Sequence, residues 1–201
     1  MTLAHENHES LKSDFLALRE QFIWINICRS TYVSLYESGP ETDALLRRSA
    51  AWFFDDLNIM IINYILLEIC KVTDPVMTMG RENLTIPNLW KQMQEFGIIS
   101  DSDLEIREAH EQVMKYRGLI KNARNRLIGH LDKKTVLGKN GVGGHHPDEV
   151  SNFFNNLQVF SDCAGRAIGV GPLDFSGGSP GKGDVLDLLK LLKGGLSHEG
   201  N

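Results

Sequence analysis

The sequence predicts an all-α protein, an up-and-down helical bundle with a C-terminal helical extension. Three observations favour this class. Apolar residues recur at steps of three and four along most of the chain, the period of one helix face. No alternation typical of strands is sustained, and no repeat is evident. The most apolar run, residues 57–70, contains Asn58, Asn63 and Glu68, so we expect a helix buried on most sides, in a core or a dimer interface, and not a membrane span.

Two long helices are expected in the first third of the chain. The first spans about residues 10–37, and its apolar face has members at helical spacing: Leu11, Phe15, Leu18, Phe22 and Ile25. The Gly39-Pro40 pair ends it. The second spans about 41–72 and stops before Pro75, because proline disfavours helix at the residue that precedes it.

A loop over residues 76–85 leads to two further helices. Pro87 suits the first turn of a short third helix, which we expect to end near Gly97. The fourth helix begins after residues 100–103, where serines and aspartates suit a helix N-terminus, and it continues to about His130.

The C-terminal third predicts two more helices, over about 148–168 and 184–195, joined by the linker-like segment 169–183. We therefore expect two parts. A helical bundle spans residues 1–134, and residues 135–201 form a Gly-rich connection with C-terminal helices packed on that bundle.

The composition is that of an ordinary globular protein, with 42% hydrophobic and 23% charged residues. The first residues, MTLAHENHES, do not resemble a signal peptide, so we expect a cytoplasmic protein that does not enter a membrane. Cys28, Cys70 and Cys163 lie far apart within apolar stretches. This pattern predicts buried thiols in a reducing compartment and neither a disulfide framework nor a zinc site.

Charge is unevenly distributed along the chain. Between Lys115 and Lys139 there are eight basic residues and one acid, Asp132, so this segment carries +7. Because the whole chain has a net charge of -5, the remainder carries -12. A basic patch on an acidic body favours a localised anionic ligand, although a solvated basic helix face would give the same pattern.

The expected fourth helix has one narrow apolar stripe, which should face a neighbouring helix: Val113, Tyr116, Ile120, Ala123 and Leu127. Arg124 and His130 flank this stripe on opposite sides, about 120° apart on an ideal α-helix. Arg126 and His130, four residues apart, share a face. If two copies of the helix pack across a twofold axis, Arg124 of one chain approaches His130 of the other, and Gly129 is able to loosen the last turn.

The run Arg124-Asn125-Arg126-Leu-Ile-Gly-His130 resembles the signature of the HEPN superfamily, an arginine and a polar residue followed by a histidine. The longer context is similar to the abortive-infection U-type (AbiU-like) branch. It comprises LLEICKVTDP (66–75), ENLTIPNLW (82–90) and RNRLIGHLDK (124–133), in this order. The resemblance covers about residues 10–134.

The resemblance implies a helical bundle that dimerises and acts as a metal-independent endoribonuclease in phage defence or as a toxin. Arginine and histidine from two chains line a composite cleft, and an antitoxin protein is a possible partner. Two features depart from the pattern. Gly129 stands where alanine is common in this branch, and five residues separate Arg124 from His130, which is wider than in many of these nucleases.

Histidine and arginine are residue types that suit the cleavage of RNA, the reaction that the resemblance implies. Cleavage of RNA without a metal needs a base near neutrality for the 2′-OH proton, and histidine has an ordinary pKa of about 6.5. It also needs a permanent cation at the phosphoryl oxygens. We therefore assign His130 as general base or acid and Arg124 as the phosphate-binding residue, and no cofactor or metal is expected. Supporting or RNA-binding roles are expected for Asn125, Arg126, Lys121, Lys133 and Lys134.

Three alternatives remain open from the sequence. Arg126 is a second candidate for the working arginine. His130 has a purely structural explanation, as a residue that caps or packs at a helix end. The chain as a whole has two other interpretations, a HEPN-like module that binds RNA, a nucleotide or an antitoxin without cutting, and a structural helical dimer.

Other polar clusters do not indicate a site. His145 and His146 lie side by side in a Gly-rich stretch without a spaced partner, which favours a surface loop over a metal site. Asp55 and Asp56 diverge by about 100° on a helix and do not readily share a cation. The aromatic run 52–54 is more typical of a core or an interface than of a base-stacking surface.

Overall fold

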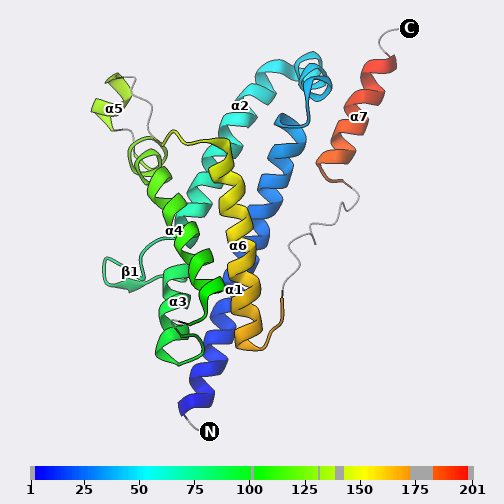
Figure 1. The fold of residues 1–201 in the computed structure, drawn as a ribbon. Helices are drawn as coiled ribbons and strands as arrows, with labels where there is room; N and C mark the ends of the chain where they lie inside the picture. Colours follow the sequence, from blue (N-terminus) through cyan, green and yellow to red (C-terminus); the bar gives the residue numbers. More distant parts are fainter. Residues whose placement is uncertain (1–2, 101, 131, 139–142, 173–182, 199–201) are drawn as a thin grey trace. The chain divides into compact units, whose positions relative to one another are not determined.

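The computed structural model is built almost entirely of helices (Figure 1), which confirms the predicted all-α class. It describes residues 3–100, 102–130, 132–138, 143–172 and 183–198. In chain order the elements are α1 (Leu3–Tyr36), α2 (Pro40–Val72), β1 (Met77–Thr78), β2 (Arg81–Glu82), α3 (Ile86–Glu95), α4 (Leu104–Ala123), the π-helix η1 (Arg124–Ile128), α5 (Lys133–Gly138), α6 (Pro147–Ile168) and α7 (Val185–His198).

The chain divides into two compact units. The first comprises Met1–Phe22 and Leu66–Phe175, and the second comprises Ile23–Ile65 and Ser176–Asn201. Helices α1 and α2 each contribute to both units. All site residues predicted from the sequence belong to the first unit. The predicted domain boundary after residue 134 stays a prediction.

The first unit has a core of large apolar side chains. The first four residues predicted for the apolar face of α1 are fully buried in it: Leu11, Phe15, Leu18 and Phe22. Helices α4 and α6 lie alongside each other (Figure 1), and the ring centroids of Tyr116 and Phe153 are 5.0 Å apart. The buried face of α4 repeats at steps of three and four through Ile106, Ala109, Val113, Tyr116, Ile120 and Ala123. This packing fixes the end of α4 from which the candidate site projects.

Three helix ends show how local sequence sets the boundaries. Thr85 caps α3, because its side chain accepts a hydrogen bond from the backbone N–H of Asn88 at 3.4 Å, and Pro87 lies in the first turn as predicted. Asp103 precedes α4, but its carboxylate accepts from the backbone N–H of Ser100 at 2.7 Å and does not cap the helix. Gly169 ends α6 in the left-handed conformation with φ 80°.

The segment predicted as a loop over 76–85 contains a small antiparallel hairpin. Met77 pairs with Glu82, and Met79 and Gly80 form the turn with φ of 51° and 78°. The side chain of Asn83 fixes the base of the hairpin by donating to the carbonyl oxygen of Pro75 at 2.7 Å. Strands of two residues are too short to show an alternating pattern, so the sequence gives no signal for them.

In the second unit, α7 packs on α1 and α2. Leu35, Leu46 and Phe54 are buried, and Val185, Leu189 and Leu192 of α7 pack against them. The hydroxyl of Tyr36 donates to the carbonyl oxygen of Phe54 at 2.8 Å. Helix α2 is kinked at Ala50, where φ is -165° and ψ is 73°.

The apolar run 57–70 is not buried on most sides in the single chain. Ile65, Ile69 and Cys70 are buried, whereas Ile59 and Met60 are more than half exposed, at 60% and 56%. The interface interpretation of this run stays a prediction. Within the described residues, none of the helices combines the length and the apolar character needed to cross a membrane.

Candidate active site

The predicted signature begins with a change of helix type. The α-helix α4 ends at Ala123, and Arg124 to Ile128 form a π-helix, η1, in which the N–H of Gly129 donates to the carbonyl oxygen of Arg124 at 2.7 Å. A β-carbon added at Gly129 would lie 3.0 Å from that oxygen, so this close approach suits glycine. The prediction of a helix to about His130 is thus correct only to Ile128, and its last turn is not α-helical.

The π-helix redirects the side chains that follow it. Val113, Tyr116, Ile120 and Ala123 are buried as the predicted stripe requires, but Leu127 is 39% exposed. A π-helix places one extra residue in the turn, so the α-helical spacing that put Leu127 on the stripe no longer holds. The prediction for Leu127 is therefore wrong, and η1 contains no buried residue.

Arg124 is held by two neighbours. Its Nη1 donates to Oδ1 of Asn125 at 2.8 Å, and its Nη2 lies 3.5 Å from Oδ2 of Asp74. The side chain of Arg124 is 36% exposed, so the guanidinium is oriented and still reaches the surface. Asp74 also pairs with Arg117 of α4, seven residues before Arg124. Oδ1 of Asp74 lies 3.3 Å from Nη2 of Arg117.

Asp74 was not predicted as a site residue. It belongs to the Thr-Asp-Pro segment that follows α2, and its contact with Arg124 spans 50 positions of sequence. Nearby, burial raises the pKa of the Cys70 thiol to about 11, although the Arg124 guanidinium acts in the opposite direction. This thiol is buried, as predicted for Cys70, and it stays protonated at neutral pH.

His130 lies beyond the helix and its side chain faces solvent. It has no hydrogen bond or ion pair with another described residue, Arg124 included. The predicted shared face of Arg126 and His130 does not apply, because His130 is no longer helical. Arg126 is exposed, and its carbonyl oxygen accepts from the N–H of Asp132 at 2.9 Å. The structure therefore leaves the imidazole accessible at the edge of a cationic segment.

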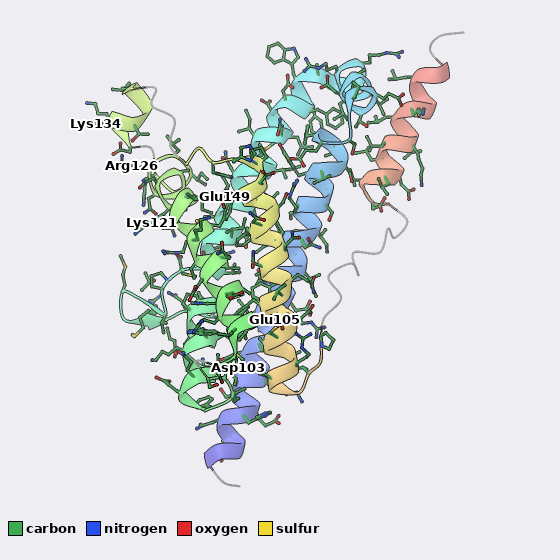
Figure 2. All side chains as sticks on the ribbon, in the orientation of Figure 1. Asp103, Glu105, Lys121, Arg126, Lys134 and Glu149 are labelled. Atoms are coloured by element: carbon green, nitrogen blue, oxygen red, sulfur yellow. The ribbon has the colours of Figure 1, made fainter. Side chains whose placement is uncertain are left out.

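Exposed basic side chains precede and follow Arg124 from the end of α4 to the start of α5. Lys121, Arg126, Lys133 and Lys134 are all exposed. In Figure 2, Lys121, Arg126 and Lys134 follow one another along α4, η1 and α5, whereas Asp103 and Glu105 mark the opposite end of α4. Acids at the N-terminus and bases at the C-terminus of a helix both suit its dipole, so part of this asymmetry stabilises α4 itself.

Asp132, between η1 and α5, caps the start of α5. The carboxylate of Asp132 accepts from the backbone N–H and the hydroxyl of Thr135, at 2.8 Å and 2.7 Å. These bonds lower the pKa of Asp132. Lys133 and Lys134 form the first turn of α5, and the Asp132 carboxylate fixes where they begin.

Of the two histidines set aside as a surface loop, His145 is packed against α4. Its Nδ1 lies 2.7 Å from the carbonyl oxygen of Gly143, so Nδ1 carries a proton and donates; in the neutral ring Nε2 then accepts from the Tyr116 hydroxyl, 3.0 Å away. His146 is exposed and caps α6. Neither joins a group of three His, Cys, Asp or Glu side chains that would hold a metal within the part of the chain that the structure describes.

The arrangement has the parts needed to bind a phosphodiester. One guanidinium is fixed at the surface, exposed lysine and arginine side chains precede and follow it in the sequence, and an accessible imidazole lies six residues further on. Cations of this kind bind the phosphate backbone, and an imidazole is the side chain that most often acts as a general base or acid. No hydrogen bond joins Arg124 to His130 within the described part of the chain.

Comparison with protein families finds a match to the AbiU2 family of HEPN proteins (HEPN_AbiU2) over residues 9–179. Comparison with curated proteins finds no match, and neither does comparison with solved structures. The family match covers the whole predicted signature and extends through α6.

Proposed function

Because the chain belongs to the AbiU2 family of HEPN proteins, we propose that it is a metal-independent endoribonuclease that acts in phage defence or as a toxin. The family confirms the resemblance found in the sequence, and it supports a HEPN-type function related to abortive infection. The proposed enzyme is a homodimer with a composite site, in which Arg124 of one protomer and His130 of its partner act on the same phosphodiester.

The observation that carries this proposal is the exposure and the hydrogen bonding of Arg124 and His130. Arg124 is fixed by Asn125 and Asp74 but remains 36% exposed, and His130 is exposed without a hydrogen-bond partner in the described part of the chain. A histidine with a structural role would pack or cap, and this one does neither. Each side chain therefore supports a role toward a ligand.

The reaction follows from the chemistry of these groups. His130 removes the proton of the 2′-OH, the 2′ oxygen attacks the adjacent phosphorus, and the 5′ oxygen leaves with a proton supplied by an acid. Arg124 stabilises the charge that builds on the phosphoryl oxygens. Asn125 orients Arg124 through its Oδ1, and its NH2 group remains to donate to a phosphate oxygen. The products are a 2′,3′-cyclic phosphate and a 5′-hydroxyl.

Cleavage of a labelled single-stranded RNA in the presence of EDTA tests the proposal. The wild-type protein should cut it, and it should leave a substrate with 2′-deoxyribose at each position intact, because the nucleophile is then missing. His130→Ala should abolish cutting. If His130→Ala cuts as well as the wild type, the assignment of His130 is wrong.

Two arginine variants identify the working guanidinium. Arg124→Ala should reduce cleavage by about 100-fold or more, the scale expected for the loss of a group that stabilises transition-state charge. Arg126→Ala, at an exposed side chain of the same π-helix, is the matched control and should mainly weaken RNA binding. The opposite ranking would assign the role to Arg126.

A second candidate is a HEPN-like module that binds RNA, a nucleotide or an antitoxin without cutting. The lack of a hydrogen bond between Arg124 and His130 within the described chain favours it, because a binding surface requires only the cations. Such a module would bind RNA with an affinity that falls steeply with salt and would leave the RNA intact after long incubation.

A further inference from the structure

The carboxylate of Asp74 lies between two arginines, one in α4 and one at the start of η1. Arg117 belongs to α4, and Arg124 is the first residue of η1, where the backbone still has α-helical dihedral angles. The two are seven residues apart, about two turns, so their side chains leave the same face. Oδ1 of Asp74 lies 3.3 Å from Arg117 Nη2, and Oδ2 lies 3.5 Å from Arg124 Nη2. One carboxylate thus uses its two oxygens on two different guanidinium groups.

The three charged side chains, Asp74, Arg117 and Arg124, are partly shielded from solvent. The side chains of Asp74, Arg117 and Arg124 are 24%, 19% and 36% exposed. The Nε of Arg117 is buried and has no hydrogen-bond partner among the described residues. Charges at such depth interact more strongly than exposed ones, so without Asp74 the two guanidinium groups would repel each other.

Asp74 also restricts where the Arg124 guanidinium points. Nη2 is directed to Asp74 and Nη1 to Asn125, so both ends of the planar group have a fixed direction. An arginine has five N–H donors, and these two contacts leave donors on the remaining edge. The contact is anchored in the fold, because Asp74 immediately precedes Pro75, whose carbonyl oxygen accepts from Asn83.

We propose that Asp74 is a positioning residue for the nuclease reaction, because its carboxylate bridges Arg117 and Arg124 and holds the Arg124 guanidinium in the orientation that meets the phosphoryl group. This inference rests on the proposed function. It adds a role for the Thr-Asp-Pro segment after α2. Asp74 itself does not touch the RNA, since a carboxylate repels phosphate.

The role predicts opposite effects on binding and on turnover. Asp74→Asn removes one negative charge beside two arginines, so RNA should bind as tightly as to the wild type or more tightly, and KM should not rise. The Arg124 guanidinium loses a fixed partner, so kcat should fall by about 10- to 100-fold, the scale of a misplaced catalytic group. A purely structural role would lower kcat and RNA affinity together.

The test measures kcat, KM and RNA affinity for four forms of the full chain beside the wild type. Asp74→Glu keeps the carboxylate on a longer side chain and should recover part of the kcat lost in Asp74→Asn. Arg117→Gln keeps the pair between Asp74 and Arg124 and should leave kcat near that of the wild type. The double variant Asp74→Asn/Arg117→Gln removes the repulsion and the unpaired buried cation, and it should remain as slow as Asp74→Asn.

Three results would overturn the inference. One is a loss of RNA affinity in Asp74→Asn together with the loss of kcat, and another is a wild-type kcat in Asp74→Asn. The third is recovery of kcat in the double variant, which would show that the unpaired Arg117, and not the orientation of Arg124, caused the loss. If Asp74→Asn does not fold, the double variant decides alone, and a wild-type kcat in it refutes the role. A wild-type protein that does not cut RNA refutes the proposed function itself, which separates the two failures.

Discussion

At the scale of single residues, His110 shows how burial controls a charge outside the candidate site. Its ring stacks on Trp90 with centroids 4.6 Å apart and planes 10° apart. Its Nε2 is buried without a hydrogen-bond partner in the described chain. Burial lowers the pKa of His110 below its ordinary value because the charged ring would lose its hydration, although Glu111 acts weakly in the opposite direction.

The lowered pKa of His110 predicts a loss of stability in acid. Below the ordinary pKa of histidine, about 6.5, the unfolded chain takes up a proton that the folded ring resists. The free energy of unfolding therefore falls as the pH decreases from that value through the lowered pKa. Urea denaturation at a series of pH values measures this fall.

The variant His110→Phe isolates the contribution of this ring from those of the other histidines. Phenylalanine keeps the stack on Trp90 and removes the titrating nitrogen, so it should be as stable as the wild type at neutral pH and less sensitive to acid. An identical pH dependence in both proteins would mean that His110 titrates as it does in the unfolded chain.

At the scale of elements, the residues just before α6 pack against the C-terminal half of α4. Gly143 has φ 79°, and a β-carbon there would lie 2.7 Å from the β-carbon of Ala123, the last residue of α4. His145 contacts Tyr116, which lies seven residues, about two turns, before Ala123 on the same side of α4. The position of η1 thus depends on a glycine that is distant from the signature.

Gly143→Ala should therefore destabilise the protein. Alanine must adopt a left-handed backbone at a cost of about 1–3 kcal/mol, and its methyl group must also displace Ala123. Thermal denaturation should show a midpoint lower by about 2–4 °C for each kcal/mol lost. Gly144→Ala is the matched control, because nothing lies within 4 Å of its added β-carbon, and it should melt like the wild type. Equal melting of the two variants would contradict the packing described here.

Periodicity predicted the helices well because each buries one face. The steps from Leu11 to Phe22 and from Val113 to Ala123 are the period of a helix that packs against neighbours, and both faces are buried. The site was less predictable. Apolar periodicity gives no signal for the shift from α- to π-helix at Arg124, where the N–H of Gly129 donates to the carbonyl oxygen of Arg124. The partner of Arg124, Asp74, is brought close only by the packing of the first unit.

At the scale of the whole molecule, the proposed nuclease requires two chains. No hydrogen bond joins Arg124 to His130 among the described residues of one protomer, and the proposal takes one of the two residues of each composite site from each chain. The second unit presents exposed apolar side chains on α2, with Trp52 at 87% and Phe53 at 57%. Their exposure in the single chain is compatible with the interface predicted for the apolar run that follows them.

Mixing two inactive variants tests whether the site is shared. Arg124→Ala and His130→Ala chains, unfolded together and refolded at equal amounts, form heterodimers in half of the molecules. In each heterodimer one composite site has both wild-type residues and the other has neither, so about a quarter of wild-type activity should return. A site within one chain would give no recovery, because every site would then lack one residue. Size-exclusion chromatography with light scattering verifies that the mixture is dimeric.

The π-helix also changes how the interval between the arginine and the histidine should be counted. A π-turn is equivalent to an α-turn with one inserted residue, so the interval of six positions here covers about the same axial length as five positions in an uninterrupted α-helix. Deleting one residue within Arg124–Ile128 would restore the α-helical hydrogen-bond pattern and leave the downstream chain in about the same direction, whereas the same deletion from a regular α-helix would turn it by roughly 100° about the axis. Alignments of such signatures by residue number alone would therefore pair side chains that occupy different directions in space.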